Sequence, residues 1–377
     1  MPSLSTIEEI LDEARSGCMF ILVDDEDREN EGDLVIPAQM ATPAAINFMA
    51  KHGRGLICLA LTRPRAEELG LRPMTDHNLS RHGTAFTVSI EAREGVTTGI
   101  SAPDRARTIA VTIDPSKGKN DIMTPGHVFP LIACDGGVLV RTGHTEAAVD
   151  IARLAGLNPS GVICEIMNDD GTMARLPELL AFAQRHGLKV GKIADLIAYR
   201  RRTEKLIERN VETRLHSVFG GVWRMIVYHN KISYAEHIAL VKGNLSDSGP
   251  VVVRMHALDV LDDVLGEQDT GRWGVLHAAM EMVAGHGRGA VVLLREPRPT
   301  ALSERVRARN EGERPSGDPL RDYGVGAQIL LDLGVRNMTL LTNNPKTIIG
   351  LEGYGLTVVG HRPIPVAASR MATKEAS

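Results

Sequence analysis

The chain has 377 residues, of which 43% are hydrophobic and 24% charged, as is ordinary for a globular protein long enough for two domains. Its net charge of −4 argues against a nucleic-acid binder. Aromatic residues make up only 3%, too few for a surface that stacks bases.

The N-terminal segment predicts an amphipathic helix. Ser5 and Glu8 have the spacing of a capping box, and the apolar residues that follow fall on one helix face. The segment lacks the basic start and apolar core of a signal peptide, and no stretch is long and apolar enough to span a membrane. Four cysteines without CxxC spacing predict reduced, buried thiols and a cytoplasmic protein: Cys18, Cys58, Cys134 and Cys164.

Seven acidic residues crowd into the ten positions from Asp24 to Asp33, between the apolar stretches 18–23 and 34–38. Apolar flanks of that length predict two buried strands, with the acidic run as their connection. Carboxylates this close repel one another, and a divalent ion such as Mg²⁺, which prefers oxygen ligands, is one compensation. A solvated acidic loop without a metal is the other interpretation.

Helices and strands are expected to alternate along the rest of the first half, which predicts an α+β or α/β domain. One helix begins at Pro43 and ends by Gly53, another follows Thr145, and a third covers 177–186. Strands are predicted over five apolar or β-branched stretches: 56–61, 86–90, 108–113, 138–141 and 162–167. The basic stretch 198–210 predicts a linker or a short exposed helix.

Arg141, Thr142, Gly143, His144 and Thr145 stand at an expected strand-to-helix junction. The first N–H groups of a helix lack partners within the helix, and the helix dipole favours an anion there. With the arginine and a threonine hydroxyl added, the pattern is typical of a phosphate site. An ordinary N-cap, with Thr142 or Thr145 capping, explains the same residues without a ligand.

Two further side chains are candidates for proton transfer. His127 follows an expected Pro-Gly turn, although a lone histidine is more often structural. Glu165 lies in the apolar stretch 162–167, so it is either paired for structure or placed for acid–base chemistry. The hydroxyl-rich turn 97–101 is a weaker indication of contact with a polyhydroxy substrate.

Residues 5–198 resemble the 3,4-dihydroxy-2-butanone 4-phosphate synthases of riboflavin biosynthesis in five segments: DDEDRENEGDLV, TTGISAPDRARTI, TPGHVFPLIA, GGVLVRTGHTEAAVDIARLAGL and GVICEIMNDDGTMARLPEL. The resemblance implies an α+β domain with active sites at a homodimer interface. It also implies conversion of D-ribulose 5-phosphate to L-3,4-dihydroxy-2-butanone 4-phosphate and formate, with Mg²⁺ or Mn²⁺. No nucleic-acid or membrane partner is expected.

The same resemblance implies roles for individual residues. Glu29 and His144 would hold the metal, and His127 and Glu165 would be the catalytic residues that transfer protons, because a ketose phosphate must lose a proton next to its carbonyl. The substrate would be bound by Arg28, Glu29, Asp33, Arg141, Thr142, Gly143, His144, Thr145 and Glu165.

Residues 213–366 resemble GTP cyclohydrolase II, for example in SYAEHIALVKGN, RDYGVGAQILLDLGV and LLTNNP. The three zinc-binding cysteines of that family would fall on Asp259, Thr270 and Arg272, and no cysteine follows Cys164. A hydrolytic zinc needs its ligands, so no zinc is expected. Two other positions depart from that family. Pro319 stands where the family has an acid, with Asp318 next to it, and Thr347 stands where the family has a lysine, with Lys346 next to it. Arg321 is retained.

The expected organisation is a synthase domain over 1–200, a linker over 201–208 and a cyclohydrolase-like α/β domain over 209–377. The second domain is expected to be inactive and to serve packing, dimer stability or regulation. One alternative is a bifunctional enzyme. Another is a new zinc site in the second domain formed by His256, Asp259 and His277. For the whole protein the alternative is a binding or scaffold protein, and for the first domain it is another metal-dependent sugar-phosphate lyase or isomerase.

Overall fold

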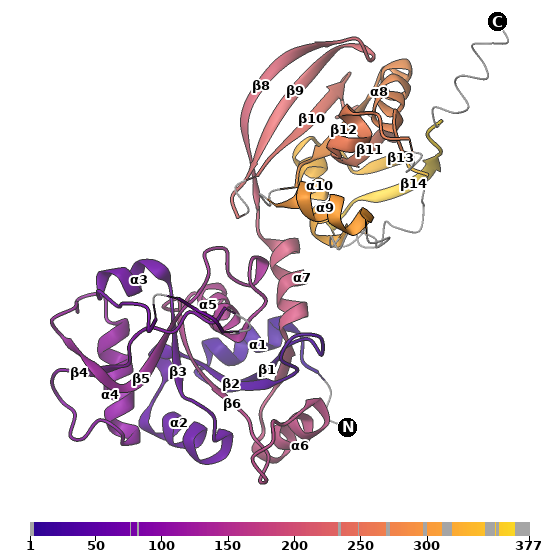
Figure 1. The fold of residues 1–377 in the computed structure, drawn as a ribbon. Coiled ribbons are helices and arrows are strands. Elements are labelled where there is room, and N and C mark those ends of the chain that lie inside the picture. Colours follow the sequence, from indigo (N-terminus) through magenta and orange to yellow (C-terminus); the bar gives the residue numbers. More distant parts are fainter. Residues whose placement is uncertain are drawn as a thin grey trace, which may run out of the picture. The chain divides into compact units, whose positions relative to one another are not determined.

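The computed structural model divides the chain into two compact units, Met1–Arg200 and Arg201–Ser377, which are described separately (Figure 1). Both are mixed α/β units, as the sequence predicts. The structure describes residues 4–365 except 76, 81–82, 233–234, 248, 269–271, 297–299, 311–318, 344–350 and 352–353. No helix among these residues is both long and apolar enough to cross a lipid bilayer.

The first unit is built on a seven-stranded sheet of order β4-β5-β3-β6-β2-β1-β7. The β1–β7 and β3–β5 pairs are parallel and the other pairs are antiparallel. The strands are β1 Phe20–Val23, β2 Gly32–Pro37, β3 Cys58–Leu61, β4 Ile90–Ala92, β5 Ile122–Ile132, β6 Ser160–Glu165 and β7 Val190–Lys192.

Helices cover both faces of this sheet. They are α1 Ile7–Arg15, α2 Pro43–Phe48, α3 Arg63–Glu68, α4 Ala102–Ile113, α5 His144–Leu154, α6 Leu176–His186 and α7 Ile193–Thr203, with short turns η1 Ala38–Met40, η2 Met49–Gly53 and η3 Gly137–Leu139. Successive side chains of a strand point to opposite faces. Phe20 and Leu22 of β1 therefore pack in one core with α1 and α5, and Ile21 and Val23 pack in the other with α2, α4 and α6.

The acidic connection between two buried strands is confirmed, because it joins β1 to β2. The predicted strand over 108–113 is wrong. These residues end α4, which starts where the Ser101 side chain accepts from the Asp104 N–H and a proline occupies the first turn. The stretch 138–141 is also no strand, since η3 lies there.

Several smaller predictions need correction. The capping box of α1 uses Thr6 and Glu9, one residue later than expected. Residues 86–90 contribute isolated bridges, and the strand begins only at Ile90. Cys58 and Cys164 are buried, but Cys18 is exposed and Cys134 only partly buried.

The second unit has a sheet of order β14-β13-β11-β12-β10-β9-β8. Its strands are β8 Ile207–Ser217, β9 Gly221–Asn230, β10 Glu236–Lys242, β11 Val251–Ala257, β12 Gly289–Leu294, β13 Asn337–Leu341 and β14 Thr357–Arg362. Its helical segments are η4 Val260–Val264, α8 Val275–His286, α9 Ala301–Asn310 and α10 Pro319–Asp332. Of the stretch 198–210, predicted as a linker or short helix, residues 198–203 are indeed helical as the end of α7, whereas residues 207–210 begin β8, the edge strand.

Candidate active site

A cavity of about 410 Å³ lies in the first unit, where the 24–33 connection, β6 and the start of α5 meet. Charged and polar side chains make up most of its wall: Arg28, Glu29, Glu31, Asp33, Thr84, Arg141, His144, Thr145 and Glu165. Cys58, Phe86, Leu131 and Ile163 complete it.

The acidic connection is an ordered turn folded around Asp24. One carboxylate oxygen of Asp24 accepts the Glu31 N–H at 2.9 Å, and the other accepts the Glu29 N–H at 3.3 Å. The second oxygen also receives the Arg28 guanidinium at 2.7 Å. Because Asp24 gathers these groups, the turn presents Glu29 toward the start of α5.

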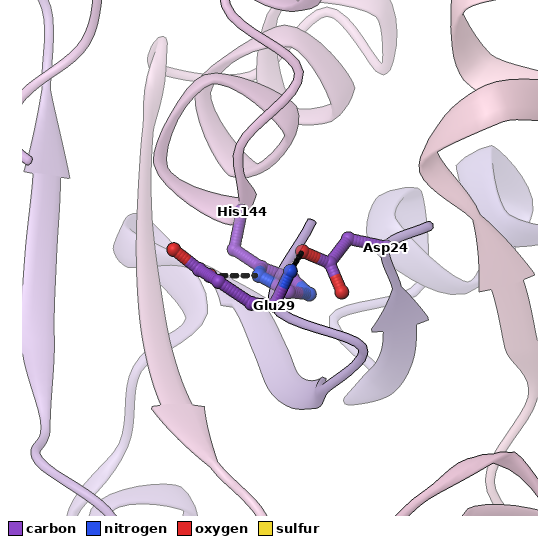
Figure 2. Close-up of side chains that lie close together, drawn as sticks. All are labelled: Asp24, Glu29 and His144. Carbon is purple, nitrogen blue, oxygen red and sulfur yellow. Dashed lines mark hydrogen bonds and ion pairs between the residues drawn. The ribbon is translucent and has the colours of Figure 1, made fainter. Parts of the chain in front are cut away.

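Asp24, Glu29 and His144 converge with one ligand atom each within 4.8 Å of the others (Figure 2). This is the one such group of three or more potential metal ligands in the described part of the chain. His144 Nε2 lies 3.2 Å from the Leu22 carbonyl, so Nε2–H donates and the Nδ1 lone pair faces the acids. Nδ1 lies 3.9 Å from oxygens of both Glu29 and Asp33.

These groups suit a divalent ion. Burial lowers the pKa of His144, although Asp24 and Glu29 act in the opposite direction. The ring is therefore neutral near pH 7, which is the form that ligates metals. Carboxylate oxygens beside one imidazole nitrogen form a donor set compatible with Mg²⁺ or Mn²⁺.

Asp33 and Glu165 occupy directly opposed positions on the antiparallel strands β2 and β6. Burial raises the pKa of Asp33 well above its usual value, and the neighbouring carboxylates, Glu165 foremost, raise it further. Burial likewise raises the pKa of Glu31. Directly opposed like charges destabilise a sheet, and a bound cation would relieve this repulsion.

The Glu165 carboxylate is held in place by the backbone. Its Oε2 accepts the Leu56 N–H at 2.8 Å. A Cβ at the preceding Gly55 would come within 2.5 Å of the same oxygen, so the close approach requires glycine. One carboxylate oxygen is thus fixed at the wall of the cavity.

The start of α5 forms another part of the wall. Its N-cap is Gly143, with no side-chain cap hydrogen bond, so the expectation of capping by Thr142 or Thr145 is wrong. Arg141 is oriented by Glu146 at 2.5 Å and by the Thr84 hydroxyl at 3.1 Å. Arg141, His144 and Thr145 line the cavity, whereas Thr142 and Gly143 are not among its lining residues.

His127 is also absent from the lining of this cavity. It lies on β5, where its Nδ1 is 2.7 Å from an oxygen of Glu91. The turn 97–101 serves α4, since the Thr97 hydroxyl and the Gly99 N–H both donate to Asp104. The structure therefore brings seven of the nine expected substrate-binding residues to the cavity and leaves His127 outside it.

Sequence reasoning missed several parts of this site. The position of Asp24 as the first acid after a buried strand is visible in the sequence, but its hydrogen bonds to the backbone of the turn are not. Thr84, Phe86 and Leu131 carry no recognisable signal, since they reach the cavity only through pairing of distant segments, such as the bridge between Phe86 and Leu131.

In the second unit, the residues at the expected zinc positions have other partners. Asp259 pairs with Arg305 at 2.8 Å, and Arg272 lies 3.6 Å from Asp262. His256 pairs with Asp263 at 2.8 Å, and His277 stacks on Phe219. Thr270, Asp318, Lys346 and Thr347 lie outside the described residues, and Pro319 and Arg321 are placed only as part of α10.

Comparisons with known proteins give the same division of the chain. The family model of 3,4-dihydroxy-2-butanone 4-phosphate synthase matches residues 8–199, and that of GTP cyclohydrolase II matches residues 208–363. "Riboflavin biosynthesis protein RibBA" of Aquifex aeolicus is 50% identical over 96% of this chain and 93% of its own length. A 3,4-dihydroxy-2-butanone 4-phosphate synthase of Photobacterium phosphoreum is 48% identical over 95% of this chain and 98% of its own length.

Solved structures agree with these matches. RibBX of A. baumannii, described as a two-domain 3,4-dihydroxy-2-butanone 4-phosphate synthase, is 40% identical with a TM-score of 0.76. That comparison covers 96% of this chain and 100% of RibBX. A 3,4-dihydroxy-2-butanone 4-phosphate synthase in complex with two magnesium ions is 42% identical, with a TM-score of 0.52, over 53% of this chain and 98% of its own.

Proposed function

Because this chain belongs to the 3,4-dihydroxy-2-butanone 4-phosphate synthase family, we propose the residues with which it carries out the reaction of that family. The enzyme converts D-ribulose 5-phosphate to L-3,4-dihydroxy-2-butanone 4-phosphate and formate with Mg²⁺, in riboflavin biosynthesis. The observation that carries the residue assignment is the convergence of Glu29, His144 and Glu165 on one cavity with Arg141 in its wall.

Substrate binding is divided between two groups of residues. Arg141, His144 and Thr145 in the cavity wall, with Thr142 and Gly143 beside them at the start of α5, bind the phosphate, because a guanidinium and a helix N-terminus without a side-chain cap suit an anion. Arg28, Glu29, Asp33 and Glu165 meet the sugar, whose hydroxyl groups donate to the carboxylates.

Glu29 and His144 hold the metal, and Asp24 keeps the turn that carries Glu29 in place. A Mg²⁺ ion bound there supplies Lewis acidity to adjacent oxygens of the sugar. The buried, neutral imidazole and its hydrogen bond to the Leu22 carbonyl support this assignment, because they fix which ring nitrogen is available.

Variants of the acidic turn test the metal assignment. Glu29→Gln should raise the Mg²⁺ concentration needed for half-maximal formate release at least about tenfold, since it removes one ligand charge. Glu26→Gln is the matched control, because Glu26 is an exposed acid of the same turn. An unchanged Mg²⁺ requirement in Glu29→Gln would remove Glu29 from the metal site.

Glu165 and His127 transfer the protons. The substrate must lose a proton next to its carbonyl and regain one later, so two groups with separate roles are needed. Glu165 has one oxygen fixed by the Leu56 N–H, which leaves the other for the substrate. His127 is partly exposed, with 43% of its side chain accessible.

The protein acts as a two-fold homodimer in which His127 of one copy completes the cavity of the other. Two observations support this proposal: His127 is not among the residues that line the cavity of its own chain, and its exposed ring is available to a second copy. Closed two-fold dimers are also the commonest homo-oligomers. The unpaired thiols of all four cysteines favour a reducing, cytoplasmic location.

The second domain lacks GTP cyclohydrolase II activity and zinc. Asp259 has a salt bridge to Arg305, and Arg272 offers a guanidinium that cannot ligate zinc. The similar two-domain structure of A. baumannii is described only as a synthase, which agrees with this proposal. The match to the cyclohydrolase family over residues 208–363 favours the alternative of a bifunctional enzyme.

Elemental analysis and a GTP assay separate these two candidates. We expect substoichiometric zinc in the purified full-length protein and no release of formate or pyrophosphate from GTP. Stoichiometric zinc together with GTP turnover would make the enzyme bifunctional.

A further inference from the structure

We propose that Glu91 is a positioning residue for His127. Its buried carboxylate holds the Nδ1 side of the imidazole ring, so that Nε2 is the atom that exchanges a proton with the substrate. This inference rests on the proposed role of His127 in proton transfer and adds to it the residue that orients the ring.

The pairing of Glu91 is the first observation. Glu91 lies in β4 and is only 5% exposed. One oxygen lies 2.7 Å from His127 Nδ1, and the other accepts the Thr108 hydroxyl at 3.3 Å. Within the described part of the chain no lysine or arginine pairs with this carboxylate. Because a carboxylate is almost never buried without a partner, the imidazole is the group that accounts for its burial.

The second observation is that the backbone is shaped around this pair. Gly99 has a φ of +89°, and a Cβ there would come within 2.1 Å of the Glu91 Oε2 atom. A Cβ at Gly126 would lie 2.0 Å from the Ile90 carbonyl oxygen, so the residue before His127 must also be glycine for β5 to approach β4 this closely. Two glycines therefore keep open the space that the carboxylate and its approach to His127 require.

The geometry favours one tautomer of the neutral ring. An ionised carboxylate only accepts hydrogen bonds, so in the neutral ring Nδ1 carries the proton and Nε2 has the lone pair. No described residue bonds to Nε2. When Nε2 takes a proton from the substrate carbon, the C–H electron pair moves toward the adjacent carbonyl and the ring becomes an imidazolium. Glu91 stabilises that cation without taking the proton, as an orienting carboxylate does in other carboxylate–histidine pairs.

The test compares Glu91→Gln, His127→Ala and the double variant in the full-length enzyme with Mg²⁺ and ribulose 5-phosphate. Glu91→Gln keeps the shape of the side chain but removes the charge. We expect kcat for formate release to fall about 10²–10⁴-fold with KM within about twofold, and the double variant to be no slower than His127→Ala. Glu94→Gln, an exposed acid three residues further along, is the matched control and should keep normal turnover.

Nitrogen-15 NMR of the histidine rings provides a readout that a purely structural role would not change. The signal assigned to His127, by its absence in His127→Ala, should show the tautomer protonated at Nδ1 in the wild-type protein. Glu91→Gln should lose that pattern. The wild-type spectrum alone would overturn the proposal if it showed protonation at Nε2, whether or not the Glu91 variant folds.

The outcomes distinguish the proposed role of His127 from the inference about Glu91. Full activity of His127→Ala would overturn the proposed function of His127, and the inference about Glu91 with it. An inactive His127→Ala combined with normal kcat in Glu91→Gln would overturn only the inference. A further loss in the double variant beyond His127→Ala would assign Glu91 a role independent of the histidine.

Discussion

Asp33 and Glu165 face each other from adjacent strands, in a cavity that also holds Glu29 and Glu31. Directly opposed like charges destabilise a sheet, and the proposed binding of a cation and a polyhydroxy substrate would account for such an arrangement. The sequence motifs predicted roles for Glu29, Asp33 and Glu165, and the structure places all three in the wall of the cavity. The sequence could not predict that Asp24 organises the turn through backbone N–H groups, because that contact depends on the path of the chain.

Glu165→Gln should separate activity from stability. We expect kcat to fall about 10²–10⁴-fold, because a proton-transfer group is lost. Removing one of two opposed carboxylates should at the same time raise the free energy of unfolding of the metal-free protein by roughly 0.2–1 kcal/mol. Formate release and thermal denaturation measure the two effects, with the exposed Glu67→Gln as control. A variant that is both fully active and no more stable would contradict the assignment.

The raised pKa values of Asp33 and Glu31 predict how pH affects stability. An acid whose folded-state pKa lies above its unfolded value favours the folded state only while it is protonated. The metal-free protein should therefore lose stability as pH rises from about 4 through these raised values. Mg²⁺ competes with the protons, so its stabilising effect should grow over the same range.

Melting temperatures with and without Mg²⁺, measured between pH 4 and pH 8, test this prediction. The difference in melting temperature with and without Mg²⁺ should increase as pH rises. This increase should be smaller in Asp33→Asn than in the wild-type protein. A difference that does not depend on pH in the wild-type protein would show that these carboxyls do not exchange protons for metal.

Secondary-structure elements were predictable where local signals agree. The strands flanking the acidic run and the helix beginning at Pro43 follow from apolar length and from a Thr-Pro start. The stretch 108–113 failed because its β-branched residues suggested a strand, while the cap at Ser101 and the proline in the first turn start a helix six residues earlier. The edge strand β8 could not be predicted, because its polar residues form a strand only by pairing with β9.

The buried pair Asp150–Arg200 ties the end of α7 to the segment that leads to Arg141. Arg200 lies 2.7 Å from Asp150 and donates to the Gly136 carbonyl at 2.8 Å, and Asp150 accepts the Val138 N–H at 2.8 Å. Removing one member of a buried pair leaves an uncompensated charge, which typically costs about 3–5 kcal/mol.

Arg200→Met should therefore lower the free energy of unfolding of the first domain by about 3–5 kcal/mol. The shift of that domain's unfolding transition in urea measures this loss. Arg153→Met is the matched control, because Arg153 approaches the same carboxylate at 3.6 Å from a half-exposed position and should contribute less than about 1 kcal/mol. Equal effects of the two substitutions would show that burial of the pair does not matter.

The family resemblance in the sequence indicated both domains and the reaction. The position of His127 relative to the cavity could not be read from the motifs, because neighbouring motifs of one chain need not serve the same site. The structure separates His127 from Glu165 by placing only the glutamate in the cavity wall. This separation is the reason for the proposed dimer.

Mixing two inactive variants tests whether the copies exchange residues. His127→Ala and Glu165→Gln should each be inactive alone. If His127 acts in the cavity of the other copy, random exchange of subunits makes half of the dimers mixed, each with one intact site. About a quarter of wild-type activity should then return. No recovery after verified subunit exchange would place both residues in the site of one chain.

The most direct test of the proposed active site is formate release from ribulose 5-phosphate by the full-length protein. We expect one formate and one dihydroxybutanone phosphate for each ribulose 5-phosphate consumed, complete loss after treatment with EDTA, and recovery on addition of Mg²⁺. We also expect Glu165→Gln to stay inactive with Mg²⁺ present. Formate production that persists without a divalent metal, or that is unaffected by Glu165→Gln, would contradict the proposed site.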